Sequence, residues 1–445
     1  MTATAPVSEL ESSTIRKLFL RLLPFLFLLY IVAYLDRINV GFAALQMRGQ
    51  LHLTDRMYGR AAGMFFAGYF FFQLPSNLVL ERFGVRKWIS ALMVVWGVVS
   101  CCTIFVRGPV SFYVLRFLLG AAEAGFFPGM ILYMKRWFPA SSRARAVAWF
   151  MTANPLAGVF GSPISGALLG LRGFGLQGWQ WLFVMEAVPA VALGIAVYWI
   201  LPENPAGAKW LTDAERVHLA SMLSEEPSGN HGLNKRDLLA VVFSPSVWVL
   251  ALIYFALPAC MYGVTLWLPI AIKSLSGLSY FATGVAATIP FILTAIAMVL
   301  VGMHSDRATE RRWHIAIPAF AGAIALAAAS HSRLPLLVVG GMTLGMMGAE
   351  SMTGPFWAMA TVQVGANAAA AIAVINSIAN LGGYFGPDII GLLRSGNGQF
   401  RGLLAIGITL AISGVLSLVA GAKPEKRMLA TNATPSTQSG GTVHP

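Results

Sequence analysis

The feature that most constrains this chain is a series of long apolar stretches that recurs from one end to the other. Each has about 17–25 residues and few charges, which is the length that an α-helix needs to cross a bilayer. Only 11% of the residues are charged, against roughly 25% in a soluble globular protein. We therefore predict an all-α integral membrane protein. Its twelve predicted spans are residues 18–40, 57–80, 88–106, 110–134, 147–170, 180–201, 246–272, 281–303, 314–331, 335–359, 369–393 and 401–421.

A polar interruption divides these spans into two groups of six. Within it, Thr212-Asp213-Ala214-Glu215 matches a capping box, so a short helix should begin there. The last residues are polar and rich in Thr, Gly and Ser, which is typical of a disordered tail. The predicted units are a cytoplasmic N-terminal tail over 1–17, a six-helix bundle over 18–201, a cytoplasmic central loop over 202–245, a second six-helix bundle over 246–421 and a cytoplasmic tail over 422–445.

The net charge of +13 follows from where the basic residues lie. If the N-terminus is cytoplasmic and the spans alternate, 20 of the 31 Lys and Arg residues fall on the cytoplasmic side. This is the positive-inside bias of membrane proteins. It predicts a multi-pass plasma membrane protein, such as a bacterial inner-membrane protein, with both termini in the cytoplasm. It also accounts for the charge without a nucleic-acid partner.

Two pairs of charged residues lie inside the predicted spans. Asp36 and Arg37 are adjacent in the first span, and Arg116 and Glu123 are seven residues apart in the fourth. A charge at the bilayer centre costs on the order of 3 kcal/mol, so such groups mark ion or substrate pathways by default. Seven residues are about two helical turns, which puts Arg116 and Glu123 on one face and able to share a cavity.

The two groups of spans repeat each other's pattern. Glu123 precedes Pro128 by five residues in the fourth span, and Glu350 precedes Pro355 by five in the tenth. Acid–arginine pairs also recur at the cytoplasmic ends of the second and eighth spans. The matching order indicates a duplicated six-helix unit, with the substrate site between the halves near the midplane. The residues of these two loops are Glu81, Arg82 and Arg86, and Asp306 and Arg307.

The types of these buried residues suit a carboxylate substrate and protons. Arg37 offers a planar guanidinium fork that matches a carboxylate and stays charged. Asp36 and Glu123 can carry protons, because desolvation and a nearby cation shift a carboxyl group in opposite directions. The alternative for the charges in the fourth span is a buried ion pair that only holds that helix to the first.

Further polar and aromatic residues could complete the site. The asparagines could instead make helix–helix hydrogen bonds, and the aromatic rings could simply pack. Glu350 is either an additional protonation site, an acceptor for substrate hydroxyls, or a hydrogen-bonded neutral acid. The candidates are Tyr69, Asn154, Asn376, Asn380, Phe356 and Trp357. Neither the three cysteines nor the histidines have metal-ligand spacing, so we expect no metal and no cofactor other than protons.

Several strings resemble the anion:cation symporter family of the major facilitator superfamily. They are Tyr34-Leu35-Asp36-Arg37-Ile38-Asn39, the segment from Arg116 to Pro128, Lys209-Trp210-Leu211-Thr212 and the segment from Asn376 to Pro387. The resemblance implies twelve helices in two pseudo-symmetric six-helix bundles. It also implies the cytoplasmic gate motif in the two acid–arginine loops. It assigns protons to Asp36 and Glu123 and anion binding and coupling to Arg37 and Arg116, and it favours Tyr69, Asn154 and Asn376 in the substrate site.

The resulting hypothesis is a proton-coupled symporter and not an enzyme. It would import a small organic anion, such as tartrate, a sugar acid or an aromatic acid, by rocker-switch alternating access, and it would act as a monomer in the lipid bilayer. An exchanger or facilitator of the same fold, and a transporter-like receptor for carboxylates, remain as alternatives. The buried acids favour symport, because exchange would need only the arginines.

Overall fold

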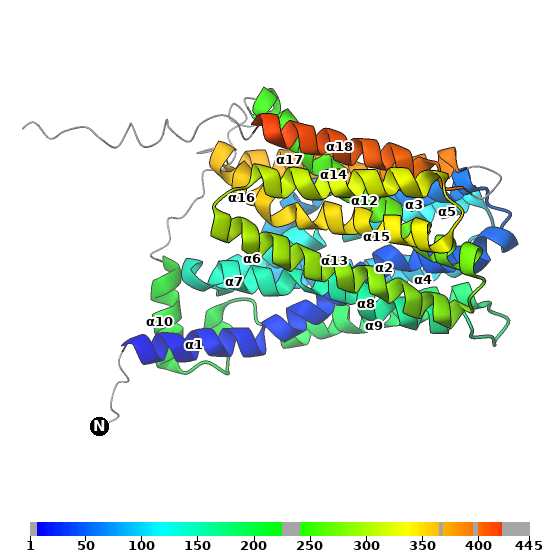
Figure 1. The fold of residues 1–445 in the computed structure, drawn as a ribbon. Coiled ribbons are helices and arrows are strands. Elements are labelled where there is room, and N and C mark those ends of the chain that lie inside the picture. Colours follow the sequence, from blue (N-terminus) through cyan, green and yellow to red (C-terminus); the bar gives the residue numbers. More distant parts are fainter. Residues whose placement is uncertain (1–6, 225–240, 365–367, 395–398, 421–445) are drawn as a thin grey trace, which may run out of the picture.

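The computed structural model describes residues 7–224, 241–364, 368–394 and 399–420. These residues form a bundle of long helices and contain no β-strand. Figure 1 shows that α1 (Val7–Arg21), α10 (Asp213–Ser224) and the C-terminal end of α18 (Gly402–Ala420) lie at the same end of the bundle. We call this end the near side and the opposite end the far side. The predicted tail over 422–445 lies outside the described residues.

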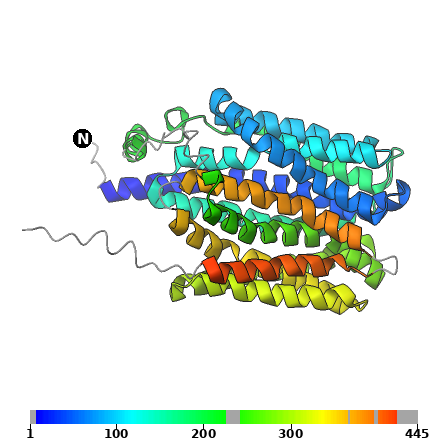
Figure 2. The ribbon, with the colours of Figure 1, turned by 90° about the horizontal axis from the view of Figure 1, so that it is seen from above.

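The helices fall into two halves, which Figure 2 shows side by side. The N-terminal half contains α2 (Leu23–Gln50), α3 (Asp55–Phe83), α4 (Val85–Cys101), α5 (Pro109–Glu123), α6 (Phe126–Trp137), α7 (Ala140–Met151), α8 (Ala153–Leu168) and α9 (Gly178–Ile200). The C-terminal half contains α12 (Pro245–Ser276), α13 (Tyr280–Ala308), α14 (Arg312–His331), α15 (Pro335–Ser351), α16 (Thr353–Val364), α17 (Ala368–Leu393) and α18. Ten helical segments of the described chain are long and apolar enough to cross a membrane. The α7–α8 pair and α17 occupy the other two predicted spans.

Three of the spans are broken in the middle, each about one turn before a proline. Proline has no N–H to donate, and its ring clashes with the carbonyl group four residues earlier. The breaks lie between α5 and α6 before Pro128, between α7 and α8 before Pro155, and between α15 and α16 before Pro355. Glu123 is the last residue of α5, and Glu350 is the last but one of α15. The duplicated pattern in the sequence therefore places Glu123 and Glu350 each beside a break in its helix.

The two halves meet mainly toward the far side. The helix pairs that join them are α3 with α17, α8 with α13, and α2 with α12. A Cβ atom on Gly63 would clash with the carbonyl oxygen of Tyr384, and one on Gly284 with that of Ser162. All four residues lie in the far-side part of their helices. The near-side segments α6, α7 and α16 make their main contacts within their own half. The structure is thus closed at the far side.

The central loop carries the helix that the capping box predicts. The N–H of Thr212 donates to Glu215 over 2.9 Å, and the N–H of Glu215 donates to the Thr212 hydroxyl over 3.3 Å. Glu215 also accepts hydrogen bonds from Ser13 and Lys17 of α1, at 3.0 and 2.8 Å. Burial raises the pKa of Glu215, but these hydrogen bonds outweigh it and hold that pKa below its ordinary value. Glu215 therefore fastens α10, which lies across the end of the bundle in Figure 1, to α1.

Candidate functional site

A buried ion pair joins the first and fourth spans at the centre of the molecule. Nε of Arg37 on α2 donates to Oε1 of Glu123 on α5 over 2.6 Å, and the Glu123 side chain is fully buried. Nη1 of Arg37 reaches the hydroxyl of Tyr262, on α12 of the other half, at 3.4 Å. The guanidinium also faces the rings of Tyr69 and Phe65, at 5.2 and 5.6 Å. Arg37 is therefore held by groups from both halves of the molecule.

Asp36 belongs to a separate polar cluster on another face of α2. Its Oδ1 accepts hydrogen bonds from the Ser100 hydroxyl at 2.5 Å and from the Asn39 amide at 3.2 Å. Glu186 on α9, which is also buried, accepts a hydrogen bond of 2.8 Å from Ser165 on α8. The second oxygens of Asp36 and Glu186 are buried without a hydrogen-bond partner in the described residues. The N-terminal half thus holds a second buried acidic site, which connects α2, α4, α8 and α9.

Arg116 is buried but unpaired. Its side chain is 1% exposed, and none of its three guanidinium nitrogens has a hydrogen-bond partner within the described chain. It stacks on the Phe65 ring at 5.1 Å, so this ring contacts both central arginines. Although Arg116 and Glu123 share one face of the fourth span, Glu123 binds Arg37 across two helices and not Arg116. Helical spacing gives the face of a residue but does not identify the partner on the next helix.

Glu350 lines a narrow cavity between the two halves. Asn154, just after the break between α7 and α8, also lines this cavity. A predicted substrate residue and the predicted additional acid therefore face the same space, although they are 196 positions apart in the sequence (350 − 154). Other lining residues are Tyr34, Met261, Phe291, Thr294 and Met298.

The other predicted pocket residues are divided between two places. Phe356 stacks on Tyr254 of α12 at 4.7 Å, and Trp357 packs edge-on against the same ring at 4.9 Å. These three rings form an aromatic wall in the C-terminal half. Asn376 and Asn380 are one turn apart on α17 and partly buried. Within the described residues, neither is hydrogen-bonded to the Arg37–Glu123 pair.

Arg86, one of the predicted gate residues after the second span, binds an acid of the central loop. Arg86 binds Glu203 at 3.4 Å, and Glu203 also lies 3.9 Å from Arg136 at the end of α6. The side chain of Glu81 is outside the described set, and Arg82 is exposed. Glu203 was missed because it lies at the start of the central loop, more than a hundred residues from Arg86 along the chain. Its only sequence signal is its position beside Pro202.

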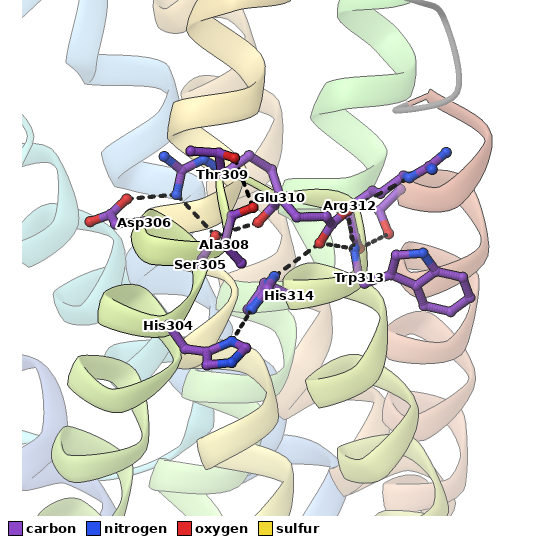
Figure 3. Close-up of polar contacts among 11 residues, drawn as sticks. His304, Ser305, Asp306, Ala308, Thr309, Glu310, Arg312, Trp313 and His314 are labelled. Carbon is purple, nitrogen blue, oxygen red and sulfur yellow. Dashed lines mark hydrogen bonds and ion pairs between the residues drawn. The ribbon is translucent and has the colours of Figure 1, made fainter.

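In the equivalent loop of the C-terminal half, the predicted gate residues Asp306 and Arg307 have different surroundings. Asp306 pairs with Arg311 at 2.6 Å and not with the adjacent Arg307, which is exposed. Figure 3 shows a chain of polar contacts beside this pair. His304 and His314 are hydrogen-bonded at 2.6 Å, and His314 contacts Glu310 at 2.9 Å. Burial raises the pKa of Glu310, but hydrogen bonds from the N–H of Trp313 and from His314 outweigh it and lower that pKa.

Comparisons with known proteins agree with this architecture. The model of the Major Facilitator Superfamily matches residues 26–387. A putative tartrate transporter of Agrobacterium vitis is 45% identical over 415 residues, which are 93% of this chain and 92% of that protein. A quinolone resistance transporter of Acinetobacter baumannii is 37% identical, over 95% of this chain and 98% of that protein. A solved bacterial homologue of the human lysosomal transporter Spinster has a TM-score of 0.76 at 16% identity, with 89% of this chain and 96% of that chain covered.

Proposed function

We propose that this chain, which belongs to the Major Facilitator Superfamily, is a proton-coupled symporter of a small organic carboxylate. Members of this superfamily are membrane transporters and not enzymes. The observation that carries this proposal is the buried ion pair between Arg37 and Glu123. A guanidinium that already holds one carboxylate in a dry site can exchange it for another of the same geometry.

The coupling follows from competition for Arg37. While Glu123 is ionised, it occupies the guanidinium of Arg37, so Arg37 is not free to bind an anion. Protonation of Glu123 breaks the ion pair, and the freed Arg37 then binds the substrate carboxylate with help from the Tyr262 hydroxyl. Because Arg37 cannot remain buried and unpaired without a large penalty, proton and substrate enter together. Substrate release returns Arg37 to Glu123, and the proton leaves.

Asp36 and Arg116 form the second charged pair of this scheme. Both are buried, and their side chains are close enough for their charges to interact. Arg116 balances Asp36 while that group is ionised. When Asp36 takes up a proton, the positive charge of Arg116 is no longer compensated, and this strengthens the attraction for an anion in the centre of the molecule.

Alternating access would proceed by rocking of the two halves. In the present conformation they meet toward the far side, while the near-side segments remain within their own halves. The positive-inside distribution puts the near side in the cytoplasm. We take this conformation as the state that releases substrate into the cell, which is consistent with the inward transport that we propose.

The substrate class rests on the site and on the relatives. Two Agrobacterium vitis proteins that are 45% and 46% identical are described as putative tartrate transporters. The Tyr34 hydroxyl, the Asn154 amide and the Glu350 carboxyl group line one cavity and could recognise the hydroxyl groups of such an acid. The aromatic rings around Arg37 would also accept an aromatic acid. We therefore place tartrate first, followed by sugar acids and aromatic acids.

The test is uptake of labelled tartrate into proteoliposomes that contain the purified protein. An inward proton gradient should drive accumulation above the outside concentration, and counterflow should proceed without the gradient. Counterflow alone would show an exchanger or facilitator and overturn proton symport. Binding without any uptake would show a receptor. If tartrate is not bound, a thermal-shift screen of sugar acids, phthalate and hydroxybenzoates identifies the carboxylate to use.

A further inference from the structure

A second group of cations lines a surface pocket at the far side, away from the Arg37–Glu123 pair. The pocket lies between the C-terminal ends of α2, α12 and α17. Its charged lining residues are Arg48, Lys273 and Arg394, and none of the described residues that line it is acidic. Ala44, Leu45, Leu53 and Ile270 supply apolar walls. Such a concave, positively charged site concentrates anions from the surrounding solution.

The two arginines share a single carboxylate. Oδ1 of Asp55, at the start of α3, accepts a hydrogen bond from Nη2 of Arg48 and another from Nη1 of Arg394, the latter at 2.9 Å. The Nε atoms of both arginines are buried and have no hydrogen-bond partner in the described residues. Each guanidinium has five N–H donors, so one carboxylate leaves much of their capacity unused.

Aromatic rings hold these guanidinium groups in position. The Trp267 ring contacts both of them, 5.7 Å from Arg48 and 5.5 Å from Arg394. The Phe400 ring lies 4.6 Å from Arg394. Burial lowers the pKa of Arg394, and the like charge of Arg48 acts in the same direction. The site is thus built and rigid, and it has an excess of positive charge.

The same carboxylate also joins the two halves of the transporter. Asp55 begins α3 in the N-terminal half, whereas Arg394 follows α17 in the C-terminal half. Nearly two turns along α17 toward the membrane centre, Asp388 lies 3.6 Å from Arg60 of α3 and adds a second link between the same helices. Anything that takes Arg394 away from Asp55 therefore loosens the far-side closure.

We propose that this pocket is a far-side vestibule that binds a carboxylate before the central site opens. The incoming carboxylate displaces Asp55 from Arg48 and Arg394, occupies both guanidinium groups and so promotes separation of the halves at the far side. Lys273 binds a second carboxylate where the substrate has one. The inference deepens the proposed function, because it assumes that the transported molecule is a carboxylate.

The test compares variants by the KM for tartrate supplied from either side of sided proteoliposomes. In Arg394→Gln and Arg48→Gln, loss of a charge-assisted contact should raise the far-side KM about tenfold and leave the near-side KM unchanged. In Asp55→Asn, the competitor is removed and the far-side KM should fall. Arg333→Gln removes an exposed far-side charge outside the pocket and is the matched control. Equal effects at both sides, or an unchanged far-side KM, would overturn the vestibule.

Two further measurements separate this inference from the function it rests on. The first is calorimetric titration of tartrate into Arg37→Lys, in which the central site is impaired. If Arg37→Lys still binds tartrate and the double variant Arg37→Lys/Arg394→Gln does not, the result supports the vestibule, even if the wild type shows no transport. If the double variant still binds tartrate, the vestibule is overturned. The second varies the lipid. If Arg394→Gln changes the far-side KM only in vesicles that contain phosphatidylglycerol, the pocket binds a lipid phosphate, and the proposal is contradicted.

Discussion

Single residues decide the chemistry here, and the sequence identifies them better than it identifies their partners. Asp36, Arg37, Arg116 and Glu123 stand out because a charge inside an apolar span needs a reason. Which acid meets which arginine depends on how α2 and α5 rotate against each other. Arg37 and Glu123 are 86 residues apart, and no local pattern records their contact. Phe65, which faces both arginines, looks in the sequence like any other apolar residue.

Arg37→Lys should weaken tartrate binding at least tenfold. Lysine keeps the charge but cannot make the paired, planar hydrogen bonds of a guanidinium. Binding by purified protein in detergent measures this directly. Arg82→Lys, the same exchange at an exposed position, is the control. An unchanged affinity in Arg37→Lys would show that the substrate carboxylate binds elsewhere.

Asp36→Asn should abolish uphill uptake while counterflow stays measurable. The amide keeps the size of the side chain and can still bond to Ser100 and Asn39, but it cannot carry a proton. The measurement is accumulation of labelled tartrate under an inward proton gradient, beside counterflow in the same vesicles. Concentrative uptake by Asp36→Asn would remove Asp36 from the proton pathway.

Elements were predicted well where the signal is local. The two-half pattern, the spans and the capping box of α10 follow from apolar runs, repeats and side chain–backbone spacing within four residues. The helix breaks follow from Pro128, Pro155 and Pro355. That two of these breaks lie beside Glu123 and Glu350 became clear only from the structure. Contacts between loops were predicted poorly. Glu203 and His304 find their partners through the packing of separate helix ends.

Glu215→Gln should loosen α1 from α10 at neutral pH. The free energy of unfolding should fall by about 1–3 kcal/mol, as is usual when a buried, charged hydrogen-bonding group is removed. Because its pKa is lowered in the folded state, Glu215 stabilises the fold above its ordinary pKa of 4.5. This contribution is lost as the pH falls through the folded-state pKa. The difference in melting temperature between wild type and variant should therefore shrink below pH 4.5. Asp213→Asn, at a 94% exposed side chain, is the control. A difference that persists at low pH would contradict an ionic role.

At the scale of the whole molecule, the far-side closure depends on close contact between helices. Gly284→Val should shift the population toward separation at the far side, because a Cβ there would clash with the backbone of Ser162. Gly302→Val on the same helix has open space around it and serves as the control. Spin labels at Arg107→Cys and Arg333→Cys, in a background without native cysteines, report the separation of the two halves. The label distance should lengthen only with Gly284→Val; equal distances in both variants would argue against this closure.

The central claim is that Glu123 and the substrate compete for Arg37. The most direct test is the affinity for tartrate as a function of pH, measured on purified wild type and on Glu123→Gln. The wild type should bind more weakly as the pH rises, because ionised Glu123 retains Arg37. Glu123→Gln should bind at least as tightly and lose most of this pH dependence. Retention of the full pH dependence in Glu123→Gln would contradict the account.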